Sequence, residues 1–331
     1  MKSVSLILFC LCVLAGLSVV SAGIGRYPVP PAAILSWMVT GHSVDANIPF
    51  ILLNIRLPRL IAAITAGGAL ALSGAAYQGL FRNPMVSPDI LGVSSGSGFG
   101  AALGILLSMP VAGVQLMSFT GGITAVLVAM VVSRSIGRGH DSVLVLVLSG
   151  IVISSLFGAL LSMLKYIADP LDKLPAITYW LMGSLADVRM SELAIVIPLV
   201  ISGAVPLLLI SWRLNVLSFG EDEARSLGLH TGLMRAVVIV SATLVSASII
   251  SVSGIIGWVG LVVPHIARFV AGPNHRLLFP VSFLFGAMFM LVVDTLARSV
   301  AAVEIPIGII TAVAGAPFFI YVMKKSSLKS W

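Results

Sequence analysis

Charged side chains are scarce in this 331-residue chain. Asp, Glu, Lys and Arg make up only 9% of it, whereas average soluble domains carry about 25%. Hydrophobic residues account for 59%, and the mean hydropathy is +1.13. A water-soluble globule cannot cover its surface with so few charges. The composition therefore excludes a soluble enzyme, a disordered chain and a nucleic-acid-binding domain.

Cysteine is almost absent as well, because the chain has only Cys10 and Cys12. Residues two apart point to different sides of a helix, and no other potential ligand stands near them at a metal-binding spacing. The sequence therefore predicts neither a disulfide framework nor a metal site.

No lysine in the chain follows a glycine. A phosphate-binding loop needs Gly-Lys followed by Ser or Thr, because the loop backbone and the lysine hold the phosphates together. The chain therefore cannot hydrolyse ATP by a P-loop mechanism. We expect it not to be an enzyme, and any energy taken from ATP has to come through another polypeptide.

Long uncharged stretches are what this sequence has in abundance. A helix needs about 20 mostly apolar residues to cross the hydrocarbon core. The stretches of about that length or longer are 3–25, 60–81, 90–133, 142–164, 193–212, 236–267, 277–293 and 305–323. The stretch 90–133 is long enough for two spans that turn near Pro110, whereas 236–267 is long for one span and short for two.

The distribution of basic residues resolves this ambiguity. A break near Ser253-Gly254 gives ten spans and places both termini on one side, together with most of the 19 Lys and Arg residues. The basic residues on the other side are Arg26, Arg56, Arg59, Lys165, Lys173, Arg189 and Arg298. Basic residues gather on the cytoplasmic side. We therefore predict an all-α integral membrane protein of about ten transmembrane helices in the cell (inner) membrane, one transmembrane domain over 1–331, with both termini cytoplasmic.

The first span has features of a cleavable signal peptide, namely Lys2, an apolar run and Val20-Ser21-Ala22. The run is long for such a peptide. Its removal would leave nine spans, so we expect the first span to be retained.

Three polar segments separate the spans, at about 26–55 and 165–192 outside and at about 213–235 inside. The second outer segment is expected to carry a short helix around 176–184. The inner segment carries the clearest signal of a helix that lies outside the membrane.

This inner helix is predicted from its two ends. Ser218 and Glu221 have the S-x-x-E spacing of a capping box, and the acidic run Glu221 to Glu223 suits the positive end of a helix dipole. Gly228 can end the helix in the left-handed conformation. Because two turns are too short to be stable alone, we interpret the helix as a lever that docks on a cytoplasmic partner. The alternative is a solvated connecting loop.

The sequence 92–96 matches G-x-S-x-G, the pattern of a hydrolase nucleophile elbow. That elbow needs a preceding strand and a histidine in reach, whereas this motif opens an apolar span. Gly92, Gly96, Gly100 and Gly104 recur every four residues. We therefore interpret the motif as a small-residue ridge that lets another helix approach closely.

A cation-coupled carrier would need a carboxylate at mid-membrane depth. Asp294 is the best candidate, but an ion pair with Arg298 one turn later explains it equally well. Asp89 lies at the head of a span and can act as a helix N-cap. A cation-coupled secondary transporter of a bulky organic solute stays the alternative function.

Three arginines stand at the outer side against the orientation bias. Arg56 and Arg59 open the second span, and Arg298 closes the ninth. One interpretation is snorkelling to lipid headgroups. The other is an acceptor site for carboxylates of an outside partner.

A weak internal repeat points to transporter architecture. Ser73-Gly74 precedes Pro84, and Ser253-Gly254 precedes Pro264, at the same spacing. The two stretches would begin on opposite sides of the membrane, as inverted repeats do.

These residues lie within a longer series of motifs. In chain order the motifs are RLPR at 56–59, GALALSG at 68–74, QGLFRNP at 78–84, PDILGVSSG at 88–96, ARSLGL at 224–229, GWVGLVVPHIAR at 257–268, DTLAR at 294–298, EIPIG at 304–308 and GAPF at 315–318. Together they resemble the FecCD-type permease subunit of type II ABC importers, which take up iron–siderophores, haem and cobalamin.

The resemblance implies a homodimer with a translocation path along its axis. It further implies two cytoplasmic ATPase subunits that bind ATP and Mg, no cofactor on this chain, and a substrate-binding protein that docks outside. The most favoured cargo is a ferric siderophore, with haem, cobalamin and molybdate open.

Site residues follow from the resemblance by position. Arg56, Arg59 and Arg298 correspond to acceptors for glutamates of the binding protein. The coupling helix that contacts the ATPase corresponds to Ser218, Glu221, Asp222, Glu223, Arg225, Gly228 and Leu229. The inner gate corresponds to Asn83, Met85, Ser142 and Val143. The path lining corresponds to Ser149, Ser154, Ser155, Gly158 and Ser162.

Overall fold

The computed structural model describes residues 2–25, 27–41, 45, 47–136 and 142–326, and within these ranges it is helical without strands. The helices in chain order are α1 (Lys2–Gly23), α2 (Pro31–Thr40), α3 (Asn47–Ile51), the π-helical turn η1 (Leu52–Arg56), α4 (Leu57–Phe81), the 3-10 turn η2 (Pro88–Leu91), α5 (Val93–Leu106), α6 (Val111–Ile136), α7 (Ser142–Ile167), α8 (Lys173–Leu181), α9 (Met190–Leu217), α10 (Glu221–Ser226), α11 (Thr231–Ser253), α12 (Val259–Ala271), α13 (His275–Ser299) and α14 (Ile307–Ser326).

Seven helical stretches are long and apolar enough to cross a membrane: α1, the continuous stretch from α3 to α4, α6, α7, α9, α11 and α13. Three shorter apolar helices, α5, α12 and α14, complete the bundle. The described part of the chain therefore holds ten apolar helices, seven of them of full membrane-spanning length, and the predicted all-α membrane fold class is confirmed.

The long uncharged stretch 236–267 breaks where the charge distribution placed the break. α11 ends at Ser253, and Gly254 takes a left-handed φ of 67° while its N–H donates to the Ile250 carbonyl. α12 begins at Val259. The predicted turn near Pro110 is also present, because α5 ends at Leu106 and α6 begins at Val111.

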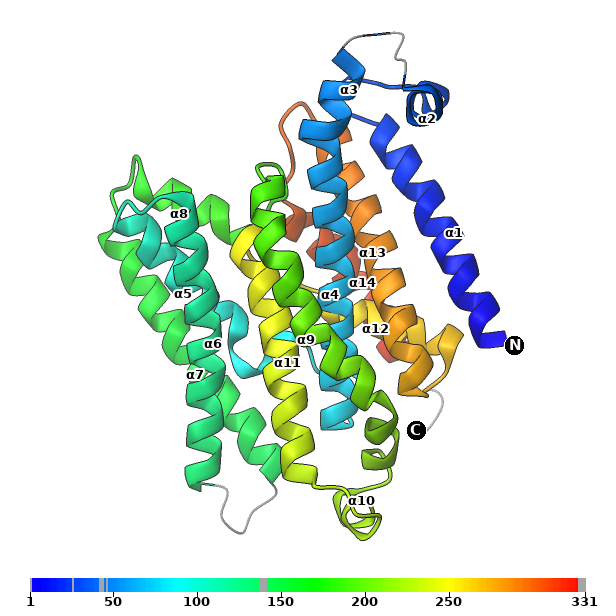
Figure 1. Ribbon diagram of the computed structural model, residues 1–331. Helices are drawn as coiled ribbons and strands as arrows, with labels where there is room; N and C mark the ends of the chain where they lie inside the picture. Colours follow the sequence, from blue (N-terminus) through cyan, green and yellow to red (C-terminus); the bar gives the residue numbers. More distant parts are fainter. Residues whose placement is uncertain (1, 26, 42–44, 46, 137–141, 327–331) are drawn as a thin grey trace.

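Helix α4 forms the centre of the bundle (Figure 1) and packs against α9, α11, α12 and α13. In the most apolar window of the α3–α4 stretch, 83% of the residues are buried inside the bundle. In the corresponding window of α1, which lies at the edge, only 6% are buried. Gly67 on α4 faces Gly286 on α13 so closely that a Cβ on either would meet the other's carbonyl oxygen. Lipid tails are as apolar as the side chains, so close backbone packing of this kind holds membrane helices together.

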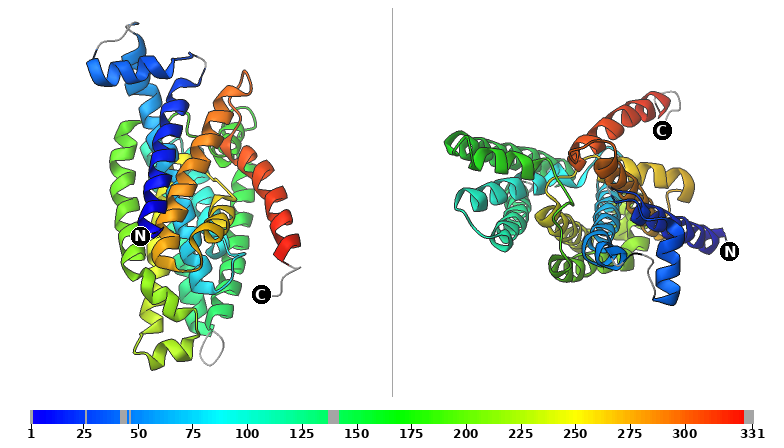
Figure 2. Two further views of the ribbon diagram at one scale, coloured as in Figure 1. Left: turned by 90° about the vertical axis from the view of Figure 1, so that its right-hand side faces the viewer. Right: turned by 90° about the horizontal axis from the view of Figure 1, so that it is seen from above.

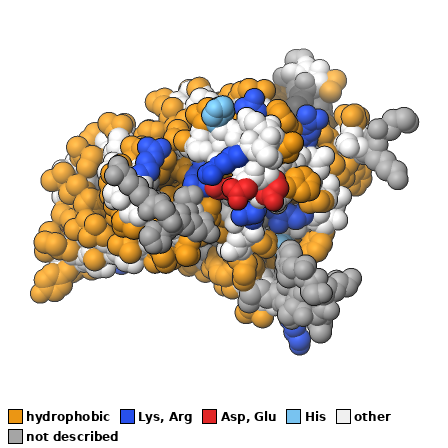
Figure 3. Space-filling model, turned by 90° about the horizontal axis from the view of Figure 1, so that it is seen from below, with side chains coloured by type: hydrophobic (Ala, Val, Ile, Leu, Met, Phe, Trp, Pro, Cys, Tyr) orange, Lys and Arg blue, Asp and Glu red, His pale blue; other side chains and the backbone are white. Residues whose placement is uncertain are grey.

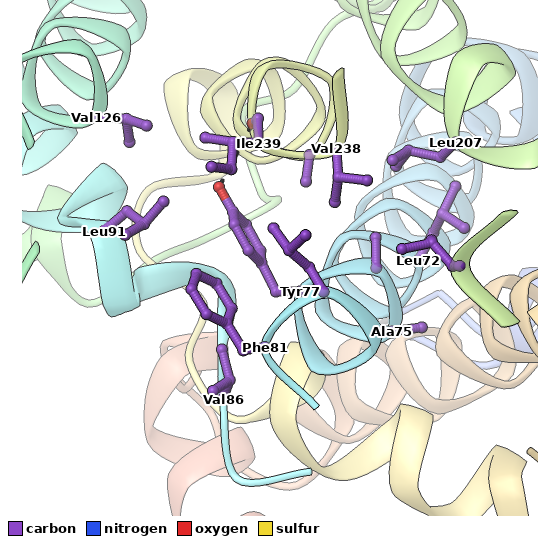
Figure 4. Packing of buried hydrophobic residues seen from close by; sticks show 14 of the residues in the cluster. Leu72, Ala75, Tyr77, Phe81, Val86, Leu91, Val126, Leu207, Val238 and Ile239 are labelled. Carbon is purple, nitrogen blue, oxygen red and sulfur yellow. Dashed lines mark hydrogen bonds between the residues drawn. The ribbon is translucent and has the colours of Figure 1, made fainter. Parts of the chain in front are cut away.

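Polar contacts join α4 to α11 inside the bundle. The Tyr77 hydroxyl lies 2.9 Å from the Thr243 hydroxyl, and the Ser73 hydroxyl donates to the Ala242 carbonyl at 3.0 Å. Figure 4 shows Tyr77 pointing toward Ile239 of α11, with Phe81 beside it; the two rings stack 5.8 Å apart. These bonds satisfy polar groups that have no access to water.

The small-residue ridge of α5 packs on α6. A Cβ on Gly96 would run into the Gly121 carbonyl, and one on Gly100 into the Met117 carbonyl. Gly104 lies against Val114, while Gly92 instead precedes α5 and faces Ser154 of α7. The packing interpretation is confirmed for the three glycines within α5.

Two details at the start of α5 differ from the expectations. The element before the G-x-S-x-G motif is a 3-10 turn and not a strand, so no nucleophile elbow forms. Asp89 lies inside that turn and accepts a hydrogen bond from the Ser94 hydroxyl, whereas the N-cap of α5 is Gly92. The prediction that Asp89 caps the helix is therefore wrong.

The internal repeat does not appear as a local structural match. Ser73-Gly74 lies inside α4, with Pro84 beyond its end. Ser253-Gly254 instead ends α11, and Pro264 lies inside α12. The two stretches have different local structures, and inverted-repeat character stays a prediction.

Helix α14 leans away from the rest of the bundle (Figure 2). α1 begins and α14 ends toward the side at which α10 lies, which we call the α10 end (Figures 1 and 2). The opposite side, which holds α2 and α8, is called the α2 end.

The connecting segments are more helical than the polar stretches predicted. The segment 26–55 contains α2, α3 and most of η1, and Arg26 lies outside the described residues. In this segment the pKa of Asp45 is lowered, because the Tyr27 hydroxyl and the Asn47 backbone N–H donate to its carboxylate. The expected short helix of 165–192 is α8, while the inner segment shrinks to 218–230 because α9 and α11 extend into it.

Candidate functional site

The short helix α10 is present, but it begins differently from the prediction. It starts at Glu221 with Gly220 at the N-cap position and no side-chain cap. The Ser218 hydroxyl donates instead to the Leu214 carbonyl at the end of α9. The predicted capping box is therefore wrong, because α9 runs on through Leu217 and takes Ser218 as its own C-cap. The acidic first turn is as predicted.

The other end of α10 forms a Schellman motif. Gly228 has a φ of 82° and donates its N–H to the Arg225 carbonyl at 2.9 Å. The Leu229 N–H reaches back to the Ala224 carbonyl at 3.0 Å. The left-handed glycine that the sequence predicted is confirmed.

Helix α10 is fixed to the bundle by one buried residue and by ion pairs. Ala224 is fully buried between α10 and its neighbours α9 and α11. Glu221 pairs with Arg235 of α11 and with Arg225 one turn later at 3.4 Å. The Arg225 Nε also donates to the Thr231 hydroxyl at 3.2 Å. These contacts hold in place a helix that is too short to be stable alone.

Two large apolar side chains flank α10 and face outward. Phe219 is 77% exposed and Leu227 is 68% exposed, while the Asp222 side chain is 95% exposed. Figure 3 shows the acidic side chains gathered in one small patch at this end, with basic side chains beside them. Exposed apolar groups rimmed by charge are typical of a protein-binding surface.

The predicted gate residues lie near the same end. Asn83 and Met85 belong to the connection after α4, where the Asn83 side-chain oxygen accepts the Met85 N–H at 2.9 Å. Met85 is 52% exposed. Val143 lies at the start of α7 and packs against the core that contains Phe81. Ser142 is the first residue of α7, and its side chain lies outside what the structure describes.

The predicted path residues lie along α7 but divide between its faces. Ser149 is buried and Ser154 half-buried, whereas Ser155 and Ser162 are exposed and nothing lies within 4 Å of a Cβ placed on Gly158. Each serine hydroxyl donates to a carbonyl of its own helix. The exposed face of α7 is therefore free to line a path, and the face with Ser149 packs inside the subunit.

The outer arginines converge at the α2 end. Arg59 is 8% exposed, and its Nε lies 2.8 Å from Asp294 of α13. Its Nη1 lies 2.9 Å and 3.0 Å from the two oxygens of Glu304, which lies between α13 and α14. One guanidinium thus joins three parts of the fold.

Arg298 and Arg56 bind the end of α1. Arg298 lies 3.4 Å from Asp294 and donates to the Ile24 and Ser21 carbonyls at 2.6 Å and 2.5 Å. Arg56, only 6% exposed, donates to the Ala22 and Tyr27 carbonyls. The structure therefore brings the three arginines together, with their charged ends turned toward internal acceptors. No contact in the structure tests the docking role expected of them, which stays a prediction.

Asp294 is fully buried between Arg59 and Arg298. The expected ion pair with Arg298 is confirmed. The link to Arg59 and the part played by Glu304 were missed, because these partners are 235 and 245 residues apart from Arg59 in sequence. The one signal in the sequence was the surplus of arginine at this end, which indicates that a carboxylate of the same chain pairs with these arginines.

In the described ranges no group of three or more His, Cys, Asp or Glu side chains gathers as metal ligands. Of the two cysteines on α1, Cys10 is buried and Cys12 is exposed.

Comparison with known proteins shows which family has this architecture. The chain matches the FecCD transport family over residues 10–325. It is 41% identical over 318 residues to the molybdate import system permease protein MolB of Haemophilus influenzae, covering 94% of each chain. It is 39% identical over 307 residues to the cobalamin import system permease protein BtuC of Halobacterium salinarum, covering 92% of this chain and 82% of the relative.

A solved structure shares the whole fold. It is described as an inward-facing conformation of an ABC transporter assigned to the metal-chelate type. It superimposes with a TM-score of 0.88 at 39% identity, covering 97% of this chain and 99% of the other. The ten-span bundle, the family match and the relatives aligned over nearly the full length agree, and the chain therefore belongs to the FecCD transport family.

Proposed function

We propose that this chain is the membrane permease subunit of an ATP-driven ABC importer. The observation that carries the proposal is α10, a six-residue helix held by Ala224 and Arg235 and flanked by the exposed Phe219 and Leu227. Such an element contributes nothing to spanning a membrane, yet it is rigidly attached to α9 and α11. It is therefore placed to pass a movement from a soluble partner into the bundle. The names of the relatives, which are import-system permeases, support this reading.

The partners follow from the proposal. Two copies of the chain form a homodimer in the membrane, and two cytoplasmic ATPase subunits bind ATP and Mg and contact the α10 helices. This chain binds no cofactor and performs no hydrolysis. ATP binding favours one relative position of the two ATPase subunits. The permease dimer then shifts toward the conformation that matches this position.

The translocation path runs between the two copies. The exposed side of α7, with Ser155, Gly158 and Ser162, lines it, and the connection carrying Asn83 and Met85 narrows it at the α10 end together with Ser142 and Val143. The side chains that line the path are nearly devoid of charge. This suits a cargo that is captured by the binding protein and needs no tight binding site on the permease.

The cargo is a metal chelate or an oxyanion delivered by an extracytoplasmic binding protein. A ferric siderophore is the first candidate, and haem, cobalamin and molybdate are the others. The relatives named for molybdate, cobalamin and hemin transport support this range without choosing within it. The ligand of the binding protein that works with this chain identifies the cargo.

Docking of the binding protein is assigned to Arg56, Arg59 and Arg298. Because Glu304 already occupies the outer side of Arg59, a carboxylate of the partner has to replace it. Glu304→Gln removes this competitor and leaves Asp294 in place. We expect the variant to capture the loaded binding protein more tightly, measured by surface binding to the permease in nanodiscs.

Asp172→Asn is the control, since Asp172 is exposed at the same end and, among the described residues, pairs with its neighbour Lys173 at 3.5 Å. Unchanged or weaker capture by Glu304→Gln, with normal thermal stability, would show that Arg59 has a purely structural role.

Transport in liposomes tests the proposal as a whole. When the chain is reconstituted together with its ATPase and binding protein, we expect the cargo to accumulate only if ATP is present on the side of the membrane that holds the ATPase. The chain reconstituted alone is expected to transport no cargo. Accumulation by the chain alone under a proton or sodium gradient would favour the secondary transporter. The full pairing of Asp294 with two arginines argues against a coupling carboxylate there.

A further inference from the structure

A cavity of about 350 Å³ lies at the α2 end. Its wall comes from the adjoining ends of α5 and α6 with their connection, from α8, the α8–α9 connection and the start of α9, and from the end of α11. It includes none of the docking, coupling, gate or path residues. The volume stands at the lower end of the roughly 300 to 1,000 Å³ that is typical of small-molecule sites. Its size suits a small headgroup.

The cavity wall is built by close backbone contacts. The Ser184 N–H donates to the Ser253 carbonyl at 2.8 Å, which ties the end of α8 to the end of α11. Gly183 and Gly254 both have left-handed φ angles, and a Cβ on Gly254 would run into the Trp180 carbonyl. The backbone of Trp180, which lines the cavity, is therefore held in place by a close approach that only glycine allows.

The charged groups of the wall have one sign. Asp187 and Glu192 bring carboxylates, Gln115 brings an amide, and no Lys, Arg or His lines the cavity. Glu192 accepts only the Arg189 backbone N–H at 3.3 Å, and neither carboxylate has an ion pair within the described part of the chain. Two carboxylates beside an apolar wall without a counter-cation attract a positively charged ligand.

The aromatic side chains narrow the class of cation. Tyr179 and Trp180 come from consecutive positions of α8, and ammonium groups are recognised by aromatic faces together with carboxylates. A calcium ion would need six to eight oxygen ligands, which a mainly apolar wall does not supply.

The cavity is reachable from outside, because Tyr179 is 48% and Val111 65% exposed. Leu107 and Leu116, beside it on the α5–α6 hairpin, are 60% and 62% exposed, which offers an apolar surface to an acyl chain.

We propose that this cavity binds an ammonium group, the chemistry shared by the headgroup of an ethanolamine phospholipid and by a free amine. Asp187 and Glu192 neutralise the charge, and Tyr179 and Trp180 cover its methylene or methyl groups. The site is separate from the docking, coupling, gate and path residues and adds a ligand at the α2 end of the protein.

The test uses the purified full-length chain in nanodiscs. Thermal unfolding is measured in phosphatidylglycerol alone, in equal parts phosphatidylglycerol and phosphatidylethanolamine, and in phosphatidylglycerol with choline chloride; retained lipid is counted by native mass spectrometry. We expect phosphatidylethanolamine to be retained and to raise the unfolding temperature. The double variant Asp187→Asn/Glu192→Gln is expected to weaken this binding by about tenfold or more.

Asp172→Asn is the matched control, since it removes an acidic charge at the same end outside the cavity. Tyr179→Leu removes an aromatic face without changing charge, and it replaces the double variant if the latter unfolds early in phosphatidylglycerol. Stabilisation by choline alone identifies a free ammonium compound as the ligand, and stabilisation by the lipid alone identifies the headgroup. If neither stabilises the protein, or if Asp172→Asn weakens binding as much as the double variant, the proposal is overturned.

Discussion

At the scale of single residues, the most demanding feature is the buried charge cluster at the α2 end. Arg59, Asp294, Arg298 and Glu304 hold α4, α13 and the start of α14 together. Burying charge is costly unless each group is paired, and removing one partner leaves the others without compensation. The cluster therefore acts as a unit in which Asp294, shared by two arginines, matters most.

Replacement of Asp294 by Ala is expected to destabilise the protein by about 3 to 5 kcal/mol, because it leaves two buried guanidinium groups without their carboxylate. The measurement is thermal or denaturant unfolding in one detergent. Asp172→Ala, at an exposed pair of the same end, should cost less than about 1 kcal/mol. Equal losses for the two variants would contradict the view that the cluster is structural.

At the scale of elements, small residues decide which helices touch. The α5 glycines meet the backbone of α6, whereas Gly158 on α7 has open space around its Cβ position. The same residue type thus serves packing in one helix and leaves a surface free in another. Sequence periodicity identifies the first pattern but does not separate it from the second.

The substitution Gly100→Leu is expected to push α5 off α6 and to cost about 1 to 3 kcal/mol, or more where the backbone cannot move. The matched control is Gly158→Leu, which meets no neighbour and gains helix propensity. Both are compared by unfolding in the same detergent. A loss for Gly158→Leu as large as that for Gly100→Leu would show that the open face of α7 is packed in the assembled protein.

The Schellman motif of α10 gives a second prediction for an element. Gly228→Val forces a β-branched residue into a left-handed conformation, which costs about 1 to 3 kcal/mol locally. Because α10 is only six residues long, we expect this strain to disorder the helix and to weaken binding of the ATPase subunit by about tenfold or more. Copurification and titration of the ATPase measure the effect.

Gly232→Val is the control for this variant, since Gly232 lies in α11 and a Cβ there meets nothing within 4 Å. ATPase binding and cargo uptake that survive Gly228→Val intact would remove α10 from the coupling role.

At the scale of the whole molecule, the bundle has two distinct ends. The α10 end carries the acidic patch (Figure 3) and the connection with Asn83, and the α2 end carries α2 and α8 (Figure 1) together with the charge cluster. The excess of basic residues toward the α10 end predicts, by the positive-inside rule, that this end lies in the cytoplasm.

Chemical labelling checks this orientation. In a Cys10→Ala/Cys12→Ala background, Ser226→Cys on α10 is expected to react with a membrane-impermeant maleimide only in inside-out vesicles. Asp172→Cys, next to α8, is expected to react only in intact spheroplasts. The reverse pattern would place α10 outside and would exclude contact with a cytoplasmic ATPase.

Features of the candidate site were predictable from the sequence where they depend on residues close together in the chain. The C-terminal glycine of α10, its acidic first turn and the Asp294–Arg298 pair depend on residues within two turns of each other. The start of α10 was not predictable, because it depends on how far α9 continues, and that is set by packing of Leu214 and Leu217 in the core. Glu304 was not predictable as a partner of Arg59 because only the fold brings them together.

The amino-acid sequence by itself determined that this is a membrane protein built from about ten apolar helices, with a helix break at Gly254. Hydropathy, charge distribution and glycine act along the chain, so these properties need no knowledge of the fold. Only the tertiary structure decided which carboxylates neutralise the outer arginines, which face of α7 stays open and where the cavity beside Trp180 forms. Each of these depends on distances between residues far apart in the chain, and helix packing alone sets those distances.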